Sequence, residues 1–362
     1  MRDRPTSADL PDPRPSACPG LLRIVQALDG GICRVKLAGG VLSSQQARAI
    51  AEAAERCASG VLELTNRSNL QIRGVLPGQQ AELIERLLAA DLGPSNPAAD
   101  DVRNLLLSPA AGLDPQALLD TRPLAAALLE LLQTTPALHG LSAKFALQLD
   151  GGEALAMLEH PHDIWLSALP GSPARLAFGL AGCPGDPPLG VVDAEQAMQL
   201  VEQLLRLFIE LAGNAHSRMR QLLSVIPASQ LLQQLQTRLP FNVQAPPTDW
   251  QRKPVSPRAP IGVYPQQQTG LCMVAAASRL GRIDAIAVKI RHALGGQERV
   301  IDDEVAGEVL GILGEDGMGR IRQAVTMLEH LEMGHVDPKQ APALADQIQS
   351  AVNDMIANCK LA

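Results

Sequence analysis

Hydrophobic and polar residues alternate over residues 31–38, and this pattern predicts a β-strand. The hydrophobic side of the strand holds Cys33 and Val35. The opposite side carries the basic residues Arg34 and Lys36, because successive side chains of a strand point to opposite faces.

The next segment predicts a helix that is capped by Ser43, with Gln46 three positions further on to complete a capping box. Apolar residues then recur at helical spacing up to Cys57, which places that thiol in the core. A second helix is expected over about residues 79–91. The pattern up to residue 92 therefore predicts a compact α+β unit of strand, helix, hairpin and helix.

The hairpin lies at residues 61–75, which read VLELTNRSNLQIRGV and predict strand, polar turn and strand. The second strand has one hydrophobic face and one polar face, and the polar face carries Asn69, Gln71 and Arg73. With Arg67 in the turn, this face suits an anionic ligand lying on the sheet, because a guanidinium group pairs well with carboxylates. A surface hairpin with solvated arginines would explain the same pattern.

The rest of the chain predicts a second α+β region. Helices are expected over residues 117–133, from Asp193 to Gly213, and over residues 216–238 with a break at Pro227. Residues 141–152 predict a strand that leads into an Asp150-Gly151-Gly152 turn, and further strands are expected over residues 154–159, 162–168 and 174–181.

A proline-rich stretch, residues 240–260, predicts a stiff linker after this region. Beyond it, residues 270–274 resemble residues 31–35, which suggests an internal repeat. A second copy of the hairpin would fall near residues 298–312, where no matching turn is found. The chain from about residue 284 onward is charged and is expected to be mostly helical.

Composition narrows the class of function. The formal net charge of −7 argues against a general nucleic-acid binder, so an anionic ligand would need a local basic cluster. No apolar run is long enough to span a bilayer, and residues 1–17 read as a disordered lead-in without the apolar core of a secretory signal. We expect a cytoplasmic protein that binds neither nucleic acid nor membrane.

The six cysteines form no C-x-x-C motif and no close pair, so metal ligands cannot be identified from their spacing. His160 and His162 flank Pro161 and could bind a metal ion, but a solvated pair of histidines in a turn is the favoured interpretation.

Basic groups on separate elements are the main chemical signal, and they are Arg67, Arg73, Arg103 and Lys144. Together with the hairpin and with Arg103-Asn104 and Lys144-Phe145, the order of these residues resembles the nitrite/sulfite reductase superfamily of sirohaem and iron–sulfur proteins. The resemblance covers roughly residues 18–283 and is closest to the cobalamin-pathway branch, the precorrin-3B synthases.

The resemblance implies an α+β fold with a ferredoxin-like half-domain (residues 18–92), a sirohaem-reductase-type domain (residues 100–239) and a partial second half-domain (residues 261–362). It also implies a site for a carboxylate-rich tetrapyrrole. Carried over residue by residue, the catalytic positions are Arg67, Arg103 and Lys144, and the cofactor-binding positions are Asn69, Gln71, Arg73 and Asn104.

This sequence departs from the family pattern at several positions. Ser68 replaces a glutamine, and Ala146 replaces a second lysine that the reductases use to bind an oxyanion. The family's closely spaced cysteines for a [4Fe–4S] cluster are not found, and Cys183 matches that motif only in part. The loss of the second lysine favours the precorrin branch over sulfite or nitrite reduction.

The resemblance therefore implies an oxygen-dependent monooxygenase that converts precorrin-3A to precorrin-3B by hydroxylation and lactone formation. Its cofactors would be a sirohaem-type iron tetrapyrrole and a [4Fe–4S] cluster. Its partners would be precorrin-3A, molecular oxygen and an NADH-linked or ferredoxin-like electron donor. A non-catalytic tetrapyrrole-binding protein, an inactive truncated homologue and a sulfite/nitrite reductase-like oxidoreductase stay open as alternatives.

Overall fold

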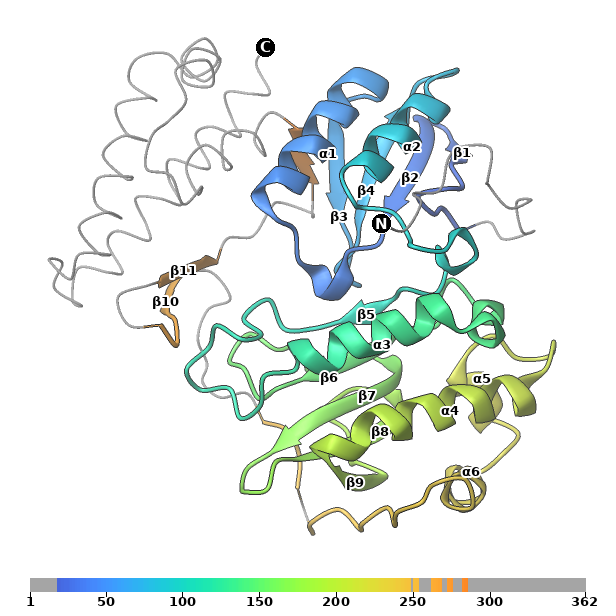
Figure 1. Ribbon diagram of the computed structural model, residues 1–362, viewed down its shortest axis with the longest axis vertical. Helices are drawn as coiled ribbons and strands as arrows, with labels where there is room; N and C mark the ends of the chain where they lie inside the picture. The colour runs from blue at the N-terminus through green and yellow to red at the C-terminus, as the bar shows by residue number, and fades with distance from the viewer. Residues whose placement is uncertain (1–17, 249, 254–261, 269–271, 276–281, 286–362) are drawn as a thin grey trace, which may run out of the picture.

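Two α+β regions stack on each other in the computed structural model, which describes residues 18–248, 250–253, 262–268, 272–275 and 282–285 (Figure 1). We refer to them as the N-terminal region, residues 18–92, and the central region, residues 98–243. The strand β5 (Leu105–Leu106) of the central region lies nearest the N-terminal region and contacts its short 3-10 helix η2 (Ala38–Gly40). The two regions therefore share an interface that is built from loops and strand ends.

An antiparallel sheet in the order β1-β2-β4-β3-β12 forms the N-terminal region. Two helices, α1 and α2, pack against each other and cover its hydrophobic face (Figure 1). The elements are β1 (Val25–Ala27), β2 (Gly30–Val35), η2 (Ala38–Gly40), α1 (Ser44–Cys57), β3 (Val61–Leu64), β4 (Leu70–Val75), α2 (Gln80–Ala89) and β12 (Arg282–Asp284).

The expected alternation in this sheet is confirmed. Cys33 lies opposite Ile72, and both are fully buried beneath the helices. Ser43 and Gln46 form the expected capping box, which satisfies amides that a helix N-terminus leaves unpaired. Cys57 is fully buried, as its helical position predicted.

The central region contains a mixed sheet in the order β5-β6-β7-β8-β9, in which the first three strands are parallel and the last three antiparallel. Its strands are β5 (Leu105–Leu106), β6 (Leu147–Asp150), β7 (His162–Leu169), β8 (Arg175–Gly182) and β9 (Gly190–Asp193). Its helices are η3 (Pro97–Ala99), α3 (Arg122–Thr134), η4 (Pro136–Gly140), η5 (Ala194–Gln196), α4 (Ala197–Ala212), α5 (Met219–Leu223) and α6 (Ala228–Gln236). A Leu-rich core lies between this sheet and α3 and α4.

The strand expected over residues 154–159 is wrong, because this segment is an irregular loop. Its polar backbone groups are bound by side chains instead of a neighbouring strand: Ala154 N donates to Asp114 Oδ2 at 2.7 Å, and Gln148 Nε2 donates to the Met157 carbonyl. The apolar composition of this short segment therefore did not predict its structure, because contacts from Asp114 and Gln148 hold it as a loop.

Two helix predictions need correction at their ends. The helix expected from residue 117 begins at Arg122, because the amides of Leu118 and Leu119 are both bonded to the Gly151 carbonyl and hold the chain outside the helix. The helix expected over residues 216–238 is two helices, α5 and α6, and Pro227 stands at the junction as predicted.

After residue 243 the described segments first contact the central region, where Gln244 pairs with Val191 and Arg252 binds Asp150, and only β12 returns to the N-terminal region. The hairpin of β10 (Gly262–Pro265) and β11 (Cys272–Ala275) precedes β12, which adds antiparallel to β3. Residues 298–312, where the repeat predicted a second hairpin, lie outside the described residues, as do the lead-in and the expected helical tail. Among the described residues, no helix is both long and apolar enough to span a bilayer.

Candidate functional site

The turn of the β3–β4 hairpin has a fixed shape. Thr65 N donates to the Asn69 carbonyl at 2.8 Å, and Ser68 N donates to the Thr65 carbonyl at 3.1 Å. Ser68 adopts a left-handed φ of 53° and packs on Gly40, where an added Cβ would come within 2.6 Å of the Ser68 Cβ. Gly40 therefore allows the turn to sit close against η2.

Arg67 lies in this turn, is half-buried, and forms no ion pair with the residues that the structure describes. Burial lowers the pKa of Arg67, and the positive charges of Arg218 and Arg34 lower it further, whereas Asp163 acts in the opposite direction. Arg67 thus extends from the N-terminal region toward charged residues of the central region. A guanidinium without a carboxylate partner in such a place is suited to bind an anion.

Arg34 belongs to the same group of cations, although the sequence interpretation did not select it as a site residue. It lies on the polar face of β2, directly opposite Gln71 of β4. Its side chain is half-buried, and its buried Nε has no hydrogen-bond partner among the described residues. The alternation over residues 31–38 had placed Arg34 on the polar face, and this was the signal that could have identified it.

Arg73 lies at the other end of β4 and is already paired. Its Nε and Nη2 donate to the two carboxylate oxygens of Asp29 at 3.0 and 2.9 Å, and Nη1 lies 3.7 Å from Glu63 Oε2. Gln71 lies between the two ends and is half-buried. A ligand carboxylate would have to displace Asp29 to reach Arg73.

Arg103 is buried in the loop that leads into β5. Its Nη2 lies 3.7 Å from Asp100 Oδ1, and its buried Nε and Nη2 have no hydrogen-bond partner in the described part of the chain. Burial lowers the pKa of Arg103, and the negative charge of Asp100 opposes this shift. Arg103 is therefore only loosely satisfied, since a distance of 3.7 Å is too long for a hydrogen bond.

Asn69 and Asn104 are both buried and contact each other across the interface between the two regions. Asn69 Nδ2 donates to Asn104 Oδ1 at 3.4 Å. Asn104 Nδ2 in turn donates to the carbonyls of Asp101, Ala143 and Phe145, each at 3.1 Å. These contacts bring the hairpin, the Arg103 loop and the Lys144 loop together.

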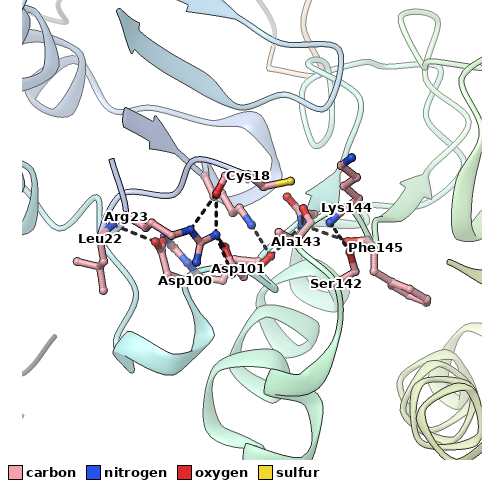
Figure 2. Close-up of polar contacts among 12 residues, drawn as sticks. Cys18, Leu22, Arg23, Asp100, Asp101, Ser142, Ala143, Lys144 and Phe145 are labelled. Carbon is pink, nitrogen blue, oxygen red and sulfur yellow. Dashed lines mark hydrogen bonds and ion pairs between the residues drawn. The ribbon is translucent and has the colours of Figure 1, made fainter. Parts of the chain in front are cut away.

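Lys144 is exposed on the loop before β6 and forms no ion pair with the described residues. Its backbone amide donates a hydrogen bond of 3.2 Å to Ser142 Oγ. Figure 2 shows its side chain pointing away from the polar network around Asp101. Its ammonium group is thus available to a ligand as a point charge.

The wall of the site opposite Arg67 is made by Asp163 and Arg218 of the central region. Asp163 is buried and accepts hydrogen bonds from Arg218 Nε at 2.9 Å, Met219 N at 2.8 Å and Ala146 N at 2.9 Å. Ala146, which stands where the reductases have a lysine, is itself buried and contacts Asp163 through its backbone amide and carbonyl. The carboxylate of Asp163, whose charge acts on Arg67, is therefore already paired with Arg218.

The interpretation of His160 and His162 as a solvated pair is wrong for His162, which is 1% exposed. The two rings lie 5.1 Å apart, and His162 Nδ1 bonds to the His160 carbonyl at 2.8 Å. Burial lowers the pKa of His162 to about 4, so the ring is neutral at physiological pH. Because Nδ1 must donate to a carbonyl, the proton lies on Nδ1.

The described cysteines do not form a metal site. Cys33 and Cys57 are fully buried, Cys18 and Cys183 are half-buried, and within the described residues no three groups of His, Cys, Asp or Glu could jointly hold a metal ion. An iron–sulfur cluster with four cysteine ligands does not fit this part of the chain. A carboxylated tetrapyrrole fits better, because Arg34, Arg67 and Lys144 have no carboxylate partner there.

Comparison with protein families identifies both regions. The nitrite/sulfite reductase ferredoxin-like half-domain matches residues 25–90, and the nitrite and sulphite reductase 4Fe-4S domain matches residues 98–243. The chain therefore carries domains of the nitrite/sulfite reductase superfamily. The expected α+β fold, with a ferredoxin-like half-domain and a reductase-type domain, is confirmed.

Individual relatives divide between two activities. The chloroplastic ferredoxin–nitrite reductase of Zea mays is 29% identical over 279 residues, which cover 70% of this chain and 48% of that protein. Precorrin-3B synthase of Sinorhizobium sp is 32% identical over 156 residues, which cover 43% of this chain and 33% of that protein.

Among solved structures, the Mycobacterium tuberculosis NirA protein superposes with a TM-score of 0.60 at 19% identity, covering 73% of this chain and 50% of that protein. This similarity supports the fold alone. The chain spans about half the length of the curated nitrite reductase from maize and of NirA.

Proposed function

We propose that the interface between the two regions binds a carboxylated tetrapyrrole, and that the chain belongs to an oxidoreductase acting on or through that macrocycle. The observation that carries the proposal is that Arg34 and Arg67, whose charges act on each other, lie at an interface that the Asn69–Asn104 contact joins to the loop of Lys144. None of the three has a carboxylate partner among the described residues. An anionic ligand would supply those partners.

The charges near the interface support a polyanion over a neutral ligand. Asp100 and Asp101 offset part of the charge of Arg23, Lys36 and Arg103, and Asp163 pairs with Arg218. Arg34, Arg67 and Lys144 form no ion pair with a carboxylate among the described residues, although the charge of Asp101 acts on Arg34 and that of Asp163 acts on Arg67. Such a concentration of cations in a chain of net charge −7 requires a specific cause.

Each cation has a separate task in this proposal. Arg67 and Arg34 pair with ligand carboxylates or with a bound oxygen-containing group, because a guanidinium can donate two parallel hydrogen bonds. Lys144 supplies a point charge at the exposed edge, and Gln71 contributes an amide on the sheet floor. An iron tetrapyrrole, when bound, would supply the redox chemistry, while the chain binds, orients and neutralises charge.

The finer proposal is a precorrin-3B synthase-like monooxygenase. It would transfer one atom of molecular oxygen to precorrin-3A, with hydroxylation and lactone formation, while a donor of two electrons reduces the other oxygen atom to water. The buried Ala146 supports this activity, because the position contributes no charge to an oxyanion pocket. The similarity to the Sinorhizobium synthase supports it as well. A cytoplasmic location and an NADH-linked or ferredoxin-like donor belong to this proposal.

The second candidate is a nitrite or sulfite reductase-like activity. The specific observation in its favour is the match to ferredoxin–nitrite reductases of maize and spinach, each covering 70% of this chain. A tetrapyrrole-binding protein without catalytic activity is a third candidate, because cluster ligands are not found among the described cysteines.

Titration of the full chain with uroporphyrin III, a polycarboxylate macrocycle, tests the shared part of these candidates by fluorescence quenching. Saturable binding that Arg34→Ala and Arg67→Ala both weaken would support the site. An affinity that is unchanged from the wild type in both variants would refute it. Assays on anaerobically purified protein then separate the candidates. Oxygen-dependent conversion of precorrin-3A supports the synthase, nitrite consumption with a reduced viologen supports the reductase, and binding without turnover supports the third candidate.

A further inference from the structure

Lys36 is a charged residue at the centre of the interface to which neither the sequence interpretation nor the proposed function gives a task. It follows the last residue of β2 and is 2% exposed, which makes it one of the largest fully buried side chains. Its Nζ donates a hydrogen bond to the backbone carbonyl of Asp101 in the central region. Lysine is almost never fully buried unless it has such a partner.

The Asp101 carbonyl is a point at which several segments meet. Besides Lys36 Nζ it accepts a hydrogen bond of 3.1 Å from Asn104 Nδ2, which also donates to the carbonyls of Ala143 and Phe145. Asn104 Oδ1 accepts from Asn69 Nδ2 of the hairpin. We call Lys36, Asn69, Asp101 and Asn104, together with these backbone carbonyls, the interdomain network.

Figure 2 shows how Asp101 lies between two anchored segments. On one side Arg23 donates to Asp101 Oδ1 and, through Nη2, to the Cys18 carbonyl at 2.7 Å. On the other side lies the loop of Ala143, Lys144 and Phe145. Movement of the Asp101 carbonyl would therefore move both segments.

Every segment of the interdomain network carries a basic residue of the candidate site. Arg34 lies two residues before Lys36, Arg67 two residues before Asn69, and Arg103 directly before Asn104. Lys144 stands between the two residues whose carbonyls Asn104 binds.

We infer that Lys36 is a positioning residue: by holding the Asp101 carbonyl it fixes the spacing of Arg34, Arg67, Arg103 and Lys144 across the two regions. The inference rests on the proposed function for the identity of the ligand. The hydrogen bonds of the interdomain network do not depend on the proposed function.

A charged lysine at this point has a cost that packing alone does not explain. Burial lowers the pKa of Lys36 to about 8, while the negative charges of Asp100 and Asp101 oppose the shift, so the ammonium is mostly charged at neutral pH. A well-packed apolar residue at a buried ionic position is often as stable or more stable. A residue that merely filled space between the regions would not need three N–H donors.

The test compares Lys36→Met with the wild-type full chain in the uroporphyrin III titration. Methionine keeps an unbranched side chain that is shorter by one heavy atom, and it removes the donor and the charge. We expect affinity to fall by roughly tenfold, the effect of about 1.4 kcal/mol. The matched control is Leu83→Ala, a fully buried position in α2 outside the network, which lowers the melting temperature but should leave affinity unchanged.

A double-mutant cycle distinguishes positioning from simple stabilisation. In the background of Asn104→Ala, which removes the other donor to the Asp101 carbonyl, Lys36→Met should cost clearly less affinity than it does alone. Fully additive losses in affinity, or losses that simply follow the melting temperature as in Leu83→Ala, would overturn the inference. If Lys36→Met does not fold, Lys36→Leu, which also removes the donor and the charge, replaces it in the cycle.

Hydrogen exchange of the ligand-free protein supplies a readout that does not depend on the proposed function. Lys36→Met should raise exchange in peptides covering residues 65–69, 100–104 and 142–147, and not in peptides of α4 or β8. Unchanged exchange in the first set would refute the positioning role even if uroporphyrin binding fell. Raised exchange with no uroporphyrin binding by the wild type would leave the network standing and refute the proposed function instead.

Discussion

The two ends of the β3–β4 hairpin carry arginines in different states. At the turn, Arg67 is half-buried and has no ion pair among the described residues. At the opposite end of β4, Arg73 forms a two-bond contact with Asp29 and a longer one with Glu63. Both arginines belong to one short motif, yet only one of them is available to a ligand without displacing a carboxylate.

The difference arises from which chain segment faces each end. Asp29 belongs to the turn between β1 and β2, and it stays within the N-terminal region. Arg67 instead faces the central region, where the nearest carboxylate, Asp163, is paired with Arg218. An arginine in a motif is therefore a ligand-binding candidate only when its surroundings leave it without a partner.

The largest expected effect comes from removing the ion pair between Asp163 and Arg218. We expect Asp163→Asn to lower the free energy of unfolding by roughly 3 kcal/mol, because it leaves the Arg218 guanidinium beside a buried site without its counter-charge. Urea denaturation measures the effect. The matched control is Glu210→Gln in the exposed Arg238–Glu210 pair, which should cost less than about 1 kcal/mol. Equal losses in both variants would contradict the assignment of Asp163 to a buried ion pair.

The next test compares the two arginines directly. Arg67→Ala should weaken binding of uroporphyrin III by ~1.5–3 kcal/mol, the usual range for a hydrogen bond to a charged group. Arg73→Ala should change affinity by less than about twofold, because Asp29 already occupies its guanidinium. Isothermal titration of the full chain measures both. A reversed order of the two effects would place the ligand at the Asp29 end of the sheet.

A third test compares a paired and an unpaired carboxyl group at the end of β6. Asp150 is paired with Arg252 at 2.8 Å, whereas Glu153 Oε1 is buried with no hydrogen-bond partner among the described residues. Burial, together with the negative charge of Asp150, raises the pKa of Glu153 from 4.5 to about 7. Between these values the folded chain holds a proton that the unfolded chain releases, so stability contributed by Glu153 falls as pH rises through this window.

Chemical denaturation at a series of pH values checks this. From about pH 5 to about pH 7 the wild type should lose ~1–2 kcal/mol more stability than Glu153→Gln, which cannot titrate. Parallel pH profiles for the two proteins would mean that Glu153 is ionised in the fold.

The smallest expected effect concerns the paired arginine itself. The hydrogen bond from Arg73 holds the pKa of the Asp29 carboxyl below its ordinary value of 3.8. In Arg73→Ala that pKa should return toward the ordinary value, whereas Arg67→Ala should leave it in place. Carbon-13 NMR of the Asp29 carboxyl during a pH titration measures the change, and an unchanged pKa in Arg73→Ala would argue that the ion pair does not persist in solution.

Local patterns predicted most of the fold of the N-terminal region. The capping box at Ser43 and the alternation in β2 and β4 depend on interactions within a few residues or on one buried face, and both are confirmed. The central region was predicted less accurately at its element ends. The start of α3 depends on the Gly151 carbonyl, which lies far away in the sequence. The assignment of residues 154–159 failed for the same reason, because Asp114 binds that segment from a distant loop.

The candidate site was predictable in its residue types and only partly in its assembly. The positions of Arg67, Arg103 and Lys144 came from an ordered resemblance, and their roles stay predictions. Lys36 and Arg34 were visible only as the polar side of a strand. Nothing in the spacing of Lys36 and Asp101 indicated that they would meet, because that contact joins residues 65 positions apart.

The sequence by itself determined the caps and the faces of the strands that carry the basic residues, because periodicity and local hydrogen bonds depend on near neighbours. The superfamily came from the resemblance of its ordered motifs. Only the tertiary structure decided which of these basic residues are neutralised. Arg73 and Arg218 meet carboxylates, whereas Arg34 and Arg67 meet none among the described residues. Charge pairing acts over a few ångströms in space, and the partner it finds is set by how distant segments pack.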